Sequence, residues 1–593
     1  MKCALHYVLS LFIIAIAVFA GLPHSTAVAQ TARQLPAEIR ADQTPPDITI
    51  TGGFVQGAGI GDFNGDGVTD FLVRYAHFVG QEAQTFVFFK FGIIFGHRNQ
   101  AQLRSINLLT DEPDLALTTS VRAGVGDSYI ATFGDLNGDG IDDIVVTHLF
   151  NQPVGQPRPT VFKIFFGSPR LQPGVIDIDA LPPDLTILTG TFNPSSLNVV
   201  GAADVNGDGA KDLLLAVNTN YINAAAAILL GPFAPGATID LTSQPPDVLI
   251  QENNRSENVN AMFVADVNGD RISDVLIRRS HFDSETGLNF TALDVIFGAA
   301  NWKPGTTISL TERPADATII AGFNYTVIQV ADVNGDGIND VLVGRPTHYG
   351  AAPPTWFAGD VSIFFGAPAL GGVISQPGAV ITGLPIPEPF HPAFQTVLGD
   401  NLGQSLAVGD VNGDGVPDLL VGAPGATTND NGKVLYMNRA HVIIGSPEMK
   451  PGARIATARA EQDVTISFDT KTSGFGRRVA TGDFNGDGVQ DILVSNDGVA
   501  YVYFSGPLRA PQLTSAKYRA AAGELTIFGK DFTGSARVEI NGVVIDRPVS
   551  FDAEQGRLTV QGGAAELNLH GGKNQIVVLR KGARSNAVAV KIK

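Results

Sequence analysis

Seven copies of one acidic motif contain most of the residues in this chain that could do chemistry. Each copy reads Asp-x-Asn-Gly-Asp-(Gly)-x-x-Asp and is followed by a short apolar run. The copies begin at Asp62, Asp135, Asp204, Asp266, Asp332, Asp410 and Asp483, so their spacings are 73, 69, 62, 66, 78 and 73 residues. A repeat of this length, with each unit reading as β-structure, is typical of a propeller or another repeat array.

The spacing of oxygen atoms in the motif suits Ca²⁺. A calcium ion takes about six to eight oxygen ligands, and a tight loop with an oxygen donor at every second residue supplies them. In each copy we expect the side chains at positions one, three, five and nine and the carbonyl at position seven to be ligands. These sets are Asp62, Asn64, Asp66, Val68, Asp70; Asp135, Asn137, Asp139, Ile141, Asp143; Asp204, Asn206, Asp208, Ala210, Asp212; Asp266, Asn268, Asp270, Ile272, Asp274; Asp332, Asn334, Asp336, Ile338, Asp340; Asp410, Asn412, Asp414, Val416, Asp418; and Asp483, Asn485, Asp487, Val489, Asp491.

The flanks of the motif predict strands. The order of ligands resembles the first half of an EF-hand loop, but an EF-hand needs a helix on each side. The flanks here, such as Ser405–Gly409 and Leu419–Gly422, are too short for helices and read as strands. The motif is therefore interpreted as a hairpin turn that holds a metal. A plain Asn-Gly or Asp-Gly turn without metal is the alternative, and seven copies with the same aspartates favour calcium.

The fourth copy departs from the pattern. It has Arg271 where the other six copies have glycine. A side chain at positive φ costs about 1 kcal/mol. We therefore expect the fourth calcium site to be weaker or empty.

Composition agrees with this interpretation. The formal charge is −18, and the seven motifs supply 21 aspartates, three in each copy. Binding to nucleic acid needs clustered Lys and Arg to neutralise phosphates, so the acidity argues against that class of partner. The 67 glycines and 35 prolines fit many short strands joined by turns. A length of 593 residues suits a large repeat domain with a smaller one beside it.

The N-terminus has the pattern of a secretory signal. An apolar core at Val8–Phe19 is followed by a small-residue cleavage site at Ala27–Ala29, so residues 1–29 are predicted to be a signal peptide. The alternative, a membrane anchor, is disfavoured by the early Pro23. The single cysteine, Cys3, lies in the removed part, so no disulfide is expected. No later stretch is apolar enough to span a bilayer, and we expect a monomer that is extracellular or periplasmic.

Each repeat divides into four predicted strands. In the fifth repeat these are Asp316–Ile320, Val327–Ala331, Val341–Gly344 and Val361–Gly366. Four strands per unit and seven units predict an all-β fold, a seven-bladed β-propeller of four-stranded blades. The propeller is expected at 44–507, after a linker at 30–43.

The last part of the chain, 508–593, lacks the motif. Alternating segments at Leu525–Gly529, Val538–Gly542, Ile576–Leu579 and Ser585–Val590 predict a small immunoglobulin-like β-sandwich. The pattern looks like an IPT/TIG-type domain. That resemblance implies a spacer or an interaction module.

The repeat resembles the FG-GAP repeat of integrin α-subunits and of many secreted bacterial proteins. The sixth copy, Gly403–Pro424, is the closest, and the Phe-Gly ends at Phe95, Phe166, Phe297 and Phe365 match as well. The resemblance implies that the strand leading into each turn is innermost and that the turn binds calcium. It also implies that Asp47–Thr51 closes the seventh blade as its outer strand.

A ligand is expected on the face opposite the calcium turns, called the calcium-free face. Antiparallel strands put successive turns on opposite faces, so loops after the second strand of each unit lie there. Aromatic, Arg and His side chains in these loops suit sugars or acidic peptides, although scattered exposed loop residues are the alternative. The candidates are Arg74, His77, His148, Arg279, His281, Arg345, His348, Tyr349 and Trp356. The loops that lead into the inner strands add Phe54, Arg122, Arg255, Tyr325, Phe390, His391, Lys471, Arg477 and Arg478. In integrins the same face meets the ligand.

Three functions remain open at this point. The first, which we favour, is a secreted or cell-surface calcium-binding propeller that acts as a binding or adhesion module for a glycan or an extracellular protein. The second is a polysaccharide lyase or another carbohydrate-active enzyme on the calcium-free face, whose chemistry needs a Tyr or His base and an Arg or metal beside a uronate. No spacing marks catalytic residues. The third is a structural envelope protein without a discrete ligand.

Overall fold

The computed structural model describes most of the chain after residue 33. The described residues are 34–54, 60–79, 86–99, 103, 105–118, 128–149, 160–177, 180–188, 197–217, 224–251, 258–283, 288–323, 327–346, 358–384, 399–428, 434–436, 438–468, 474–496, 498–552, 555–581 and 583–592. The signal peptide expected at 1–29 lies outside them. Within these ranges the chain forms strands and one short 3-10 helix, η2 (Thr457–Arg459). In this part of the chain, no helix has the length and apolar character that a membrane span needs.

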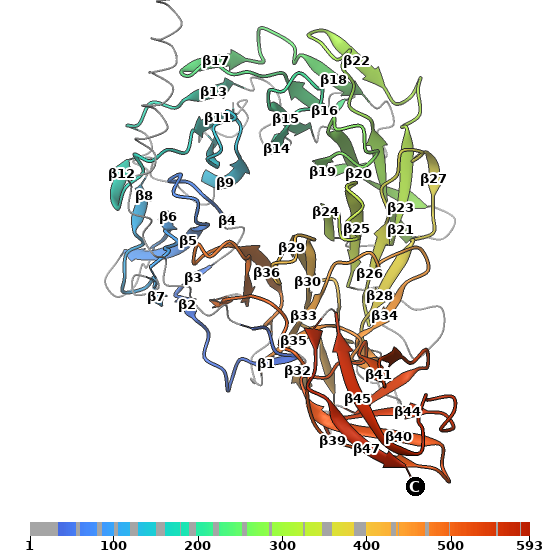
Figure 1. The fold of residues 1–593 in the computed structure, drawn as a ribbon. Coiled ribbons are helices and arrows are strands. Elements are labelled where there is room, and N and C mark those ends of the chain that lie inside the picture. Colours follow the sequence, from blue (N-terminus) through green and yellow to red (C-terminus); the bar gives the residue numbers. More distant parts are fainter. Residues whose placement is uncertain are drawn as a thin grey trace, which may run out of the picture.

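The repeats form a series of sheets arranged in chain order around a ring (Figure 1). Among the described residues there are seven such sheets, numbered here 1 to 7 after their repeats. The inner strands are β4 (Ile60–Gly61) with β3 (Gly53–Phe54), β9 (Ser128–Gly134), β14 (Leu197–Ala203), β19 (Asn258–Ala265), β24 (Val327–Ala331), β29 (Ser405–Gly409) and β36 (Arg478–Gly482). Each inner strand lies beside the next, and β36 lies beside β4. This all-β arrangement is consistent with a β-propeller.

The next three strands of each sheet pair in the expected antiparallel order. The second strands are β5 (Asp70–Val79), β10 (Asp143–Leu149), β15 (Asp212–Val217), β20 (Asp274–Asp283), β25 (Asp340–Arg345), β30 (Asp418–Ala423) and β37 (Asp491–Ser495). The third strands are β6 (Phe86–Ile94), β11 (Thr160–Phe165), β16 (Ala224–Leu229), β21 (Leu288–Ile296), β26 (Asp360–Phe364), β33 (Arg439–Ile443) and β38 (Val499–Tyr503). The fourth strands are β8 (Leu115–Thr118), β13 (Leu185–Leu188), β18 (Val248–Gln251), β23 (Ala317–Phe323), β28 (Ala379–Thr382), β35 (Val464–Ser467) and β2 (Ile48–Thr51). A hairpin of β31 (Ala426–Thr428) and β32 (Val434–Tyr436) leaves sheet 6.

Each sheet also has a fifth strand, which the four-strand prediction lacks. These strands pair in parallel with the fourth strands and are β12 (Gly174–Asp177), β17 (Ala237–Asp240), β22 (Thr306–Ser309), β27 (Gly372–Ile374), β34 (Arg454–Ala456), β1 (Glu38–Arg40) and β7 (Ile106–Asn107). Six of these strands follow the third strand of one repeat and pair with the sheet of the preceding repeat. They are β12, β17, β22, β27, β34 and β7, and for β7 the preceding sheet in the ring is sheet 7. The fifth strands are short and few of their residues are buried, with Val175 for example 72 % exposed, so most of them lack the buried alternation that marks a strand in sequence.

The N-terminal segment completes two sheets. β2 pairs with β38 of sheet 7, with Ile48 opposite Val502, as the family resemblance implies for Asp47–Thr51. β1 pairs with β35 of sheet 6, with Ile39 opposite Ile466. The segment 30–43, expected to be a linker, therefore contains a strand. Segment 30–43 is short and lies apart from the first motif. Neither property excludes an edge strand.

The core lies between neighbouring sheets. Sheets 7 and 1 share a cluster that includes the fully buried Ile50, Val73 and Phe484. Phe484 stacks on Phe71 with ring centroids 4.1 Å apart. The two ends of the ring are therefore joined by apolar packing, which stabilises by about 25 cal/mol per Å² of buried surface.

The last strands form two sheets that share one core. One sheet contains β39 (Gln512–Arg519), β40 (Glu524–Lys530), β44 (Arg557–Gln561) and β43 (Val549–Asp552), and the other contains β42 (Val543–Val544), β41 (Arg537–Ile540), β45 (Gly572–Arg580), β46 (Ala583–Arg584) and β47 (Val588–Ile592). Leu525, Ile527, Val538 and Ile576 are fully buried between them. The four strands predicted here from alternation overlap β40, β41, β45 and β47.

This C-terminal unit contacts sheet 6. The guanidinium of Arg580 is fully buried and donates to the carbonyls of Asp463 and Arg509. Lys581 Nζ lies 3.4 Å from the carbonyl oxygen of Ile444. Leu35, just before β1, forms a parallel bridge with Leu508. The N-terminal segment, sheet 6 and the C-terminal unit therefore meet at one junction.

Removal of β1 should expose the edge of sheet 6. The amide of Thr465 in β35 donates to the carbonyl of Ala37 at 2.9 Å. In a chain that starts at Thr44, this amide and its neighbours in β35 should exchange with solvent faster, as measured by hydrogen–deuterium exchange. The amides of β13 are the control because sheet 2 keeps its fifth strand. Unchanged exchange in β35 would contradict the assignment of β1 to this sheet.

Candidate functional site

The seven motif loops share one hydrogen-bonded geometry, illustrated by the fifth. Asp332 Oδ1 accepts the backbone N–H groups of Gly335 at 2.7 Å and Asp336 at 3.1 Å, and its Oδ2 accepts that of Gly337 at 2.7 Å. Asn334 Oδ1 accepts the N–H of Asp336 at 2.8 Å. Gly335 and Gly337 have φ values of 75° and 89°, a region that glycine adopts without a steric cost. The loop is therefore closed by hydrogen bonds to its own side chains, without a contribution from a ligand.

The last aspartate of each loop is buried and joins two turns. Asp340 is fully buried; its Oδ2 accepts the N–H of Val333 at 3.2 Å, and its Oδ1 accepts that of Gly366 at 3.0 Å. Burial, together with the charges of Asp336 and Asp332, raises the pKa of Asp340 to about 7. The same causes raise the pKa of Asp143 and Asp274 to about 7, of Asp212 to about 6, and of Asp70, Asp418 and Asp491 to about 8. A buried carboxylate among like charges is stabilised by a cation.

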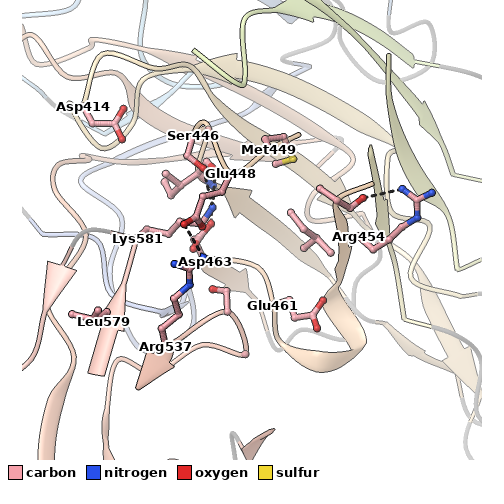
Figure 2. A pocket seen from close by; sticks show the side chains of 16 residues that line it. Asp414, Ser446, Glu448, Met449, Arg454, Glu461, Asp463, Arg537, Leu579 and Lys581 are labelled. Carbon is pink, nitrogen blue, oxygen red and sulfur yellow. Dashed lines mark hydrogen bonds and ion pairs between the residues drawn. The ribbon is translucent and has the colours of Figure 1, made fainter. Parts of the chain in front are cut away.

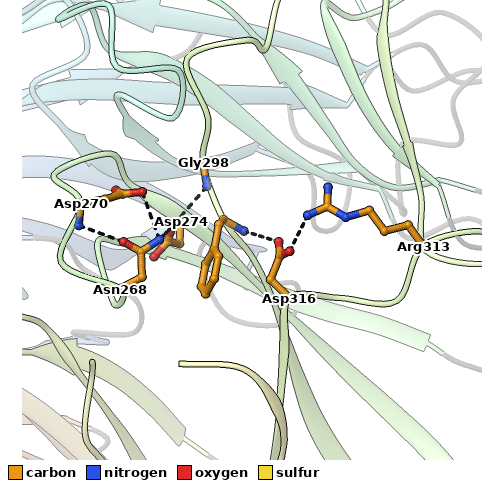
Figure 3. Close-up of polar contacts among 7 residues, drawn as sticks. Asn268, Asp270, Asp274, Gly298, Arg313 and Asp316 are labelled. Carbon is orange, nitrogen blue, oxygen red and sulfur yellow. Dashed lines mark hydrogen bonds and ion pairs between the residues drawn. The ribbon is translucent and has the colours of Figure 1, made fainter. Parts of the chain in front are cut away.

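The Phe-Gly pair at the end of a repeat places two neighbouring backbone N–H groups so that each donates to a different aspartate (Figure 3). The N–H of Gly298 donates to Asp274 at 3.1 Å, and the N–H of Phe297 donates to Asp316 at 2.9 Å. Asp316 also forms an ion pair with Arg313. A Cβ on Gly298 would lie 2.4 Å from the carbonyl oxygen of Ser273, so only glycine fits. An aspartate directly before the fourth strand caps the end of the third strand in this way in six of the seven sheets; sheet 5 has Gly378 at this position.

Neighbouring loops pack on one another around the ring. A Cβ on Gly65 of the first loop would lie 2.5 Å from the side chain of Ile141 in the second. The same relation joins Gly207 to Ile272, Gly269 to Ile338, Gly335 to Val416, Gly413 to Val489 and Gly486 to Val68. The contact between the second and third loops differs, because the third loop has Ala210 at this position and a Cβ on Gly138 would meet nothing within 4 Å.

The donor set of the loops fits Ca²⁺ by its chemistry. Each loop offers carboxylate, amide and carbonyl oxygens and no nitrogen or sulfur ligand, which is the choice of a hard cation. Among the residues that the structure describes, no three acidic, His or Cys side chains converge as metal ligands. In the fifth loop, both carboxylate oxygens of Asp332 and Oδ1 of Asp336 accept backbone N–H groups, and Oδ2 of Asp336 accepts the side-chain amide of Asn334.

Two of the predicted ligand-face residues form buried ion pairs inside their own sheets. Arg279 Nε lies 2.6 Å from Asp294, and Thr318 donates to the same carboxylate at 2.9 Å. Arg345 contacts Asp360 at 2.7 and 3.0 Å and donates to Ser362 at 2.8 Å. The side chains of Arg279 and Arg345 are only 20 % and 15 % exposed. These arginines therefore hold second and third strands together.

The remaining candidates are placed by the backbone or lie outside the described residues. His77 in β5, His148 in β10 and His281 in β20 lie towards the strand ends farthest from the motif loops, whereas Arg74 lies in the middle of β5. The backbone thus brings these three histidines to one side of the ring. His348, Tyr349 and Trp356 fall in the range 347–357, outside the residues that the structure describes.

A cavity of about 320 Å³ lies among the inner strands of sheets 1, 5, 6 and 7. Its polar lining includes Gln404, Ser405, Arg477, Arg478 and Ser495. Ser405 begins β29 and Ser495 ends β37, so these groups lie at the ends of strands away from the motif loops. Gln404 and Ser405 carry no signal in sequence, because a single polar residue before a strand is common.

Comparison with known proteins identifies the repeat. The FG-GAP repeat model matches residues 402–437 and 475–506, which contain the sixth and seventh motifs. Human phosphatidylinositol-glycan-specific phospholipase D (Homo sapiens) is 26 % identical over 297 residues, which cover 44 % of this chain and 33 % of that protein. The mouse protein (Mus musculus) of the same name is 29 % identical over 196 residues, 31 % of this chain and 20 % of its own length.

An integrin is similar as well. Integrin alpha-3 of Cricetulus griseus is 31 % identical over 154 residues, 25 % of this chain and 14 % of the integrin. A solved structure, a fungal alcohol oxidase with copper, overlaps 78 % of this chain and 98 % of its own at 10 % identity, with a TM-score of 0.24 that is too low to carry an argument. The chain spans 14 to 33 % of the curated relatives named here. It therefore contains FG-GAP repeats and is homologous to integrin α chains and to the phosphatidylinositol-glycan-specific phospholipases D over that part of their length.

Removal of divalent metal should destabilise the fold in a pH-dependent way. Calcium at about 100 times its Kd stabilises by about 2.7 kcal/mol per site, so EDTA should lower the Tm by several degrees or more. Without metal, the pKa values of about 6 to 8 mean that the folded state binds more protons than the unfolded state. Stability should then fall as pH rises through this range.

Differential scanning calorimetry tests both parts. In EDTA the Tm should rise between about pH 8 and about pH 6, and in excess calcium this rise should be lost because protons compete with the metal. A Tm that is the same with calcium and with EDTA would contradict metal binding. Magnesium in place of calcium is the control for ionic strength.

Arg271 should be a removable source of strain. It has a φ of 71°, in the left-handed region, as its position in the motif predicts. Arg271→Gly should stabilise the protein by about 0.5–1 kcal/mol and should tighten calcium binding at the fourth loop. Gly337→Arg is the matched reverse change, because a Cβ there meets nothing within 4 Å and only the backbone is strained. Urea unfolding should show effects of opposite sign, and equal signs would refute the strain.

Proposed function

We propose that this chain is an exported, calcium-stabilised binding module. In this proposal the seven sheets are the blades of a seven-bladed β-propeller at 44–507, residues 1–29 are a signal peptide, and 508–593 is an IPT/TIG-like domain. The observation that carries the proposal is the FG-GAP repeat itself, matched at 402–437 and 475–506. FG-GAP repeats are shared with integrin α chains, and this relationship fits a binding or adhesion module outside the cell.

Calcium in the motif loops would fix the scaffold. Each loop would supply the oxygens of its four side-chain donors and one carbonyl, and the bound cation would neutralise a buried carboxylate such as Asp340. The loops also pack side by side, as Gly335 does on Val416. Filling them would therefore stiffen one side of the ring and leave the other side for recognition.

The ligand-binding side is proposed to be the calcium-free face. The cavity among the inner strands presents Arg477, Arg478, Gln404 and Ser405 above an apolar floor that includes Phe71 and Leu406. Concave pockets with a few polar groups over apolar walls are the default binding sites of proteins. Guanidinium and amide groups at its rim suit hydroxyls and carboxylates. We therefore propose a glycan or an acidic surface of an extracellular protein as the ligand, bound by a monomer.

The relatives do not extend this proposal to catalysis. The phospholipases are matched over 20 to 33 % of their length. Within the described residues, the histidines and arginines of the calcium-free face are spread over several second strands, and Arg279 and Arg345 are engaged in ion pairs. A binding function is therefore favoured over an enzymatic one.

A glycan array and a panel of extracellular-matrix proteins, probed with residues 30–593 in excess calcium, test the proposal. We expect binding to one class that falls about tenfold or more in the double variant Arg477→Gln/Arg478→Gln, because hydrogen bonds to charged groups contribute about 1.5–3 kcal/mol. Arg454→Gln is the control, since Arg454 lies in the fifth strand β34 on the outer edge of sheet 5. Absence of binding to either class, or equal losses in both variants, would contradict the proposal.

A further inference from the structure

The junction between sheet 6 and the C-terminal unit contains two cavities. One, of about 710 Å³, has charged groups that pair with each other: Glu448 contacts Arg537 at 2.8 Å, and Lys581 lies beside Asp463 and Ser446 (Figure 2). The other, of about 530 Å³, is lined by the N-terminal segment, by β33 and β35 of sheet 6, and by the start of the C-terminal unit. Its size is in the range of sites for small ligands, about 300–1,000 Å³. Each cavity is lined by a residue with a buried side-chain oxygen that has no hydrogen-bond partner among the described residues: Asp463 Oδ1 at the first and Gln462 Oε1 at the second.

Buried polar groups on the wall of the second cavity are linked in a chain. His441 Nδ1 lies 3.3 Å from Thr465 Oγ1, and Thr465 accepts a hydrogen bond from Gln462 Nε2 at 2.8 Å. On the other side of the imidazole, Nε2 lies 4.0 Å from the buried carboxylate of Asp400. The imidazole and Gln462 line the cavity, and they are 2 % and 9 % exposed. This chain fixes the orientation of the Gln462 amide.

One acceptor at the end of this chain has no partner. Gln462 Oε1 is buried and has no hydrogen-bond partner among the described residues. A buried polar atom without a partner costs about 1–3 kcal/mol, so native structures satisfy such atoms with water or a ligand. Gln462 lines the cavity, so a small reorientation of its amide would bring this oxygen to an O–H or N–H donor bound there.

Cations outnumber carboxylates on the same wall. Arg439, Arg509 and Lys530 face the cavity together with Glu38 and Asp531. Behind the wall, Asp400 interacts with Arg439, and Arg580 interacts with Asp531. The negative charge of Asp400 and the positive charge of Arg580 therefore cancel in the sum. Arg509 and Lys530 are exposed, so their groups can move to a ligand. The cavity therefore has a net charge of about +1 on a chain whose formal charge is −18.

We propose that this second cavity binds a saccharide unit that carries a carboxylate. A sugar hydroxyl would donate to Gln462 Oε1, and the carboxylate would face the guanidinium groups of Arg439 and Arg509. The half-buried ring of Phe551 on the same wall offers an apolar surface for a sugar ring. This site is separate from the cavity among the inner strands. The proposal for the second cavity does not depend on whether the cavity among the inner strands binds a ligand.

Isothermal titration calorimetry of residues 30–593 with trigalacturonate in excess calcium tests the site. We expect saturable binding, with a Kd raised about tenfold or more in Arg509→Gln and in Gln462→Leu. The neutral galactose trisaccharide should bind at least about tenfold more weakly than the acidic one. Arg509 is exposed, so its variant keeps the fold testable if the buried Gln462 variant does not fold.

Two control variants distinguish this cavity from the other two cavities of the molecule. Arg537→Gln removes a cation from the neighbouring cavity at the same junction and should leave the Kd unchanged. Arg477→Gln/Arg478→Gln reports on the cavity among the inner strands: a Kd that rises in this variant and not in Arg509→Gln would assign the binding to that cavity, and this outcome separates failure here from failure of the proposed binding face. No binding of trigalacturonate, equal binding of the neutral sugar, or a loss confined to either control would overturn the proposal.

Discussion

The structure depends on a buried carboxylate at the start of each second strand. Asp340 accepts one N–H from its own motif loop and another from Gly366 at the end of the third strand, so it joins three segments of one sheet. The equivalent aspartates hold the other sheets in the same way, as Asp274 does through Gly298. A buried charge is costly without compensation. The atoms that order each sheet are therefore the same ones whose charge the proposed calcium ions would neutralise, so the architecture and the proposed metal sites depend on the same aspartates.

The strands beside the motif could be predicted from sequence because their apolar residues alternate and the motif fixes the turn between them. The resemblance to FG-GAP repeats also implied the closing role of Asp47–Thr51, and β2 does pair with β38. The fifth strands could not, since exposed residues such as Val175 and Val373 give no burial pattern. Arg345 shows a different limit. Its position near a loop predicts exposure, but its partner Asp360 lies on the next strand, and only the register of β25 and β26 brings them together.

Each sheet in this fold is completed by the repeat that follows it. The segment after the third strand returns to the preceding sheet, as β12 does in joining sheet 1 from the second repeat. The seventh repeat cannot do this for sheet 6, because after β38 the chain continues through Leu508 into the C-terminal unit. β1 takes the missing place. The N-terminal segment, sheet 6 and the C-terminal unit thus form a joint, and the cavities at this joint exist because three separate parts of the chain meet there.

The positions of β1 and β2 also bear on the order of events during synthesis. Both strands leave the ribosome first, yet their partners β35 and β38 lie more than 400 residues later in the chain. Six repeats are made before β35 appears, so the contacts that close the ring form only when nearly the whole chain is present, although β2 meets its other partner, β7, within the first repeat. Contacts of such long sequence separation form slowly. The ring therefore stays open during most of the chain's translation. A nascent chain that stops before β35 leaves one edge each of β1 and β2 exposed, and the complete chain covers both.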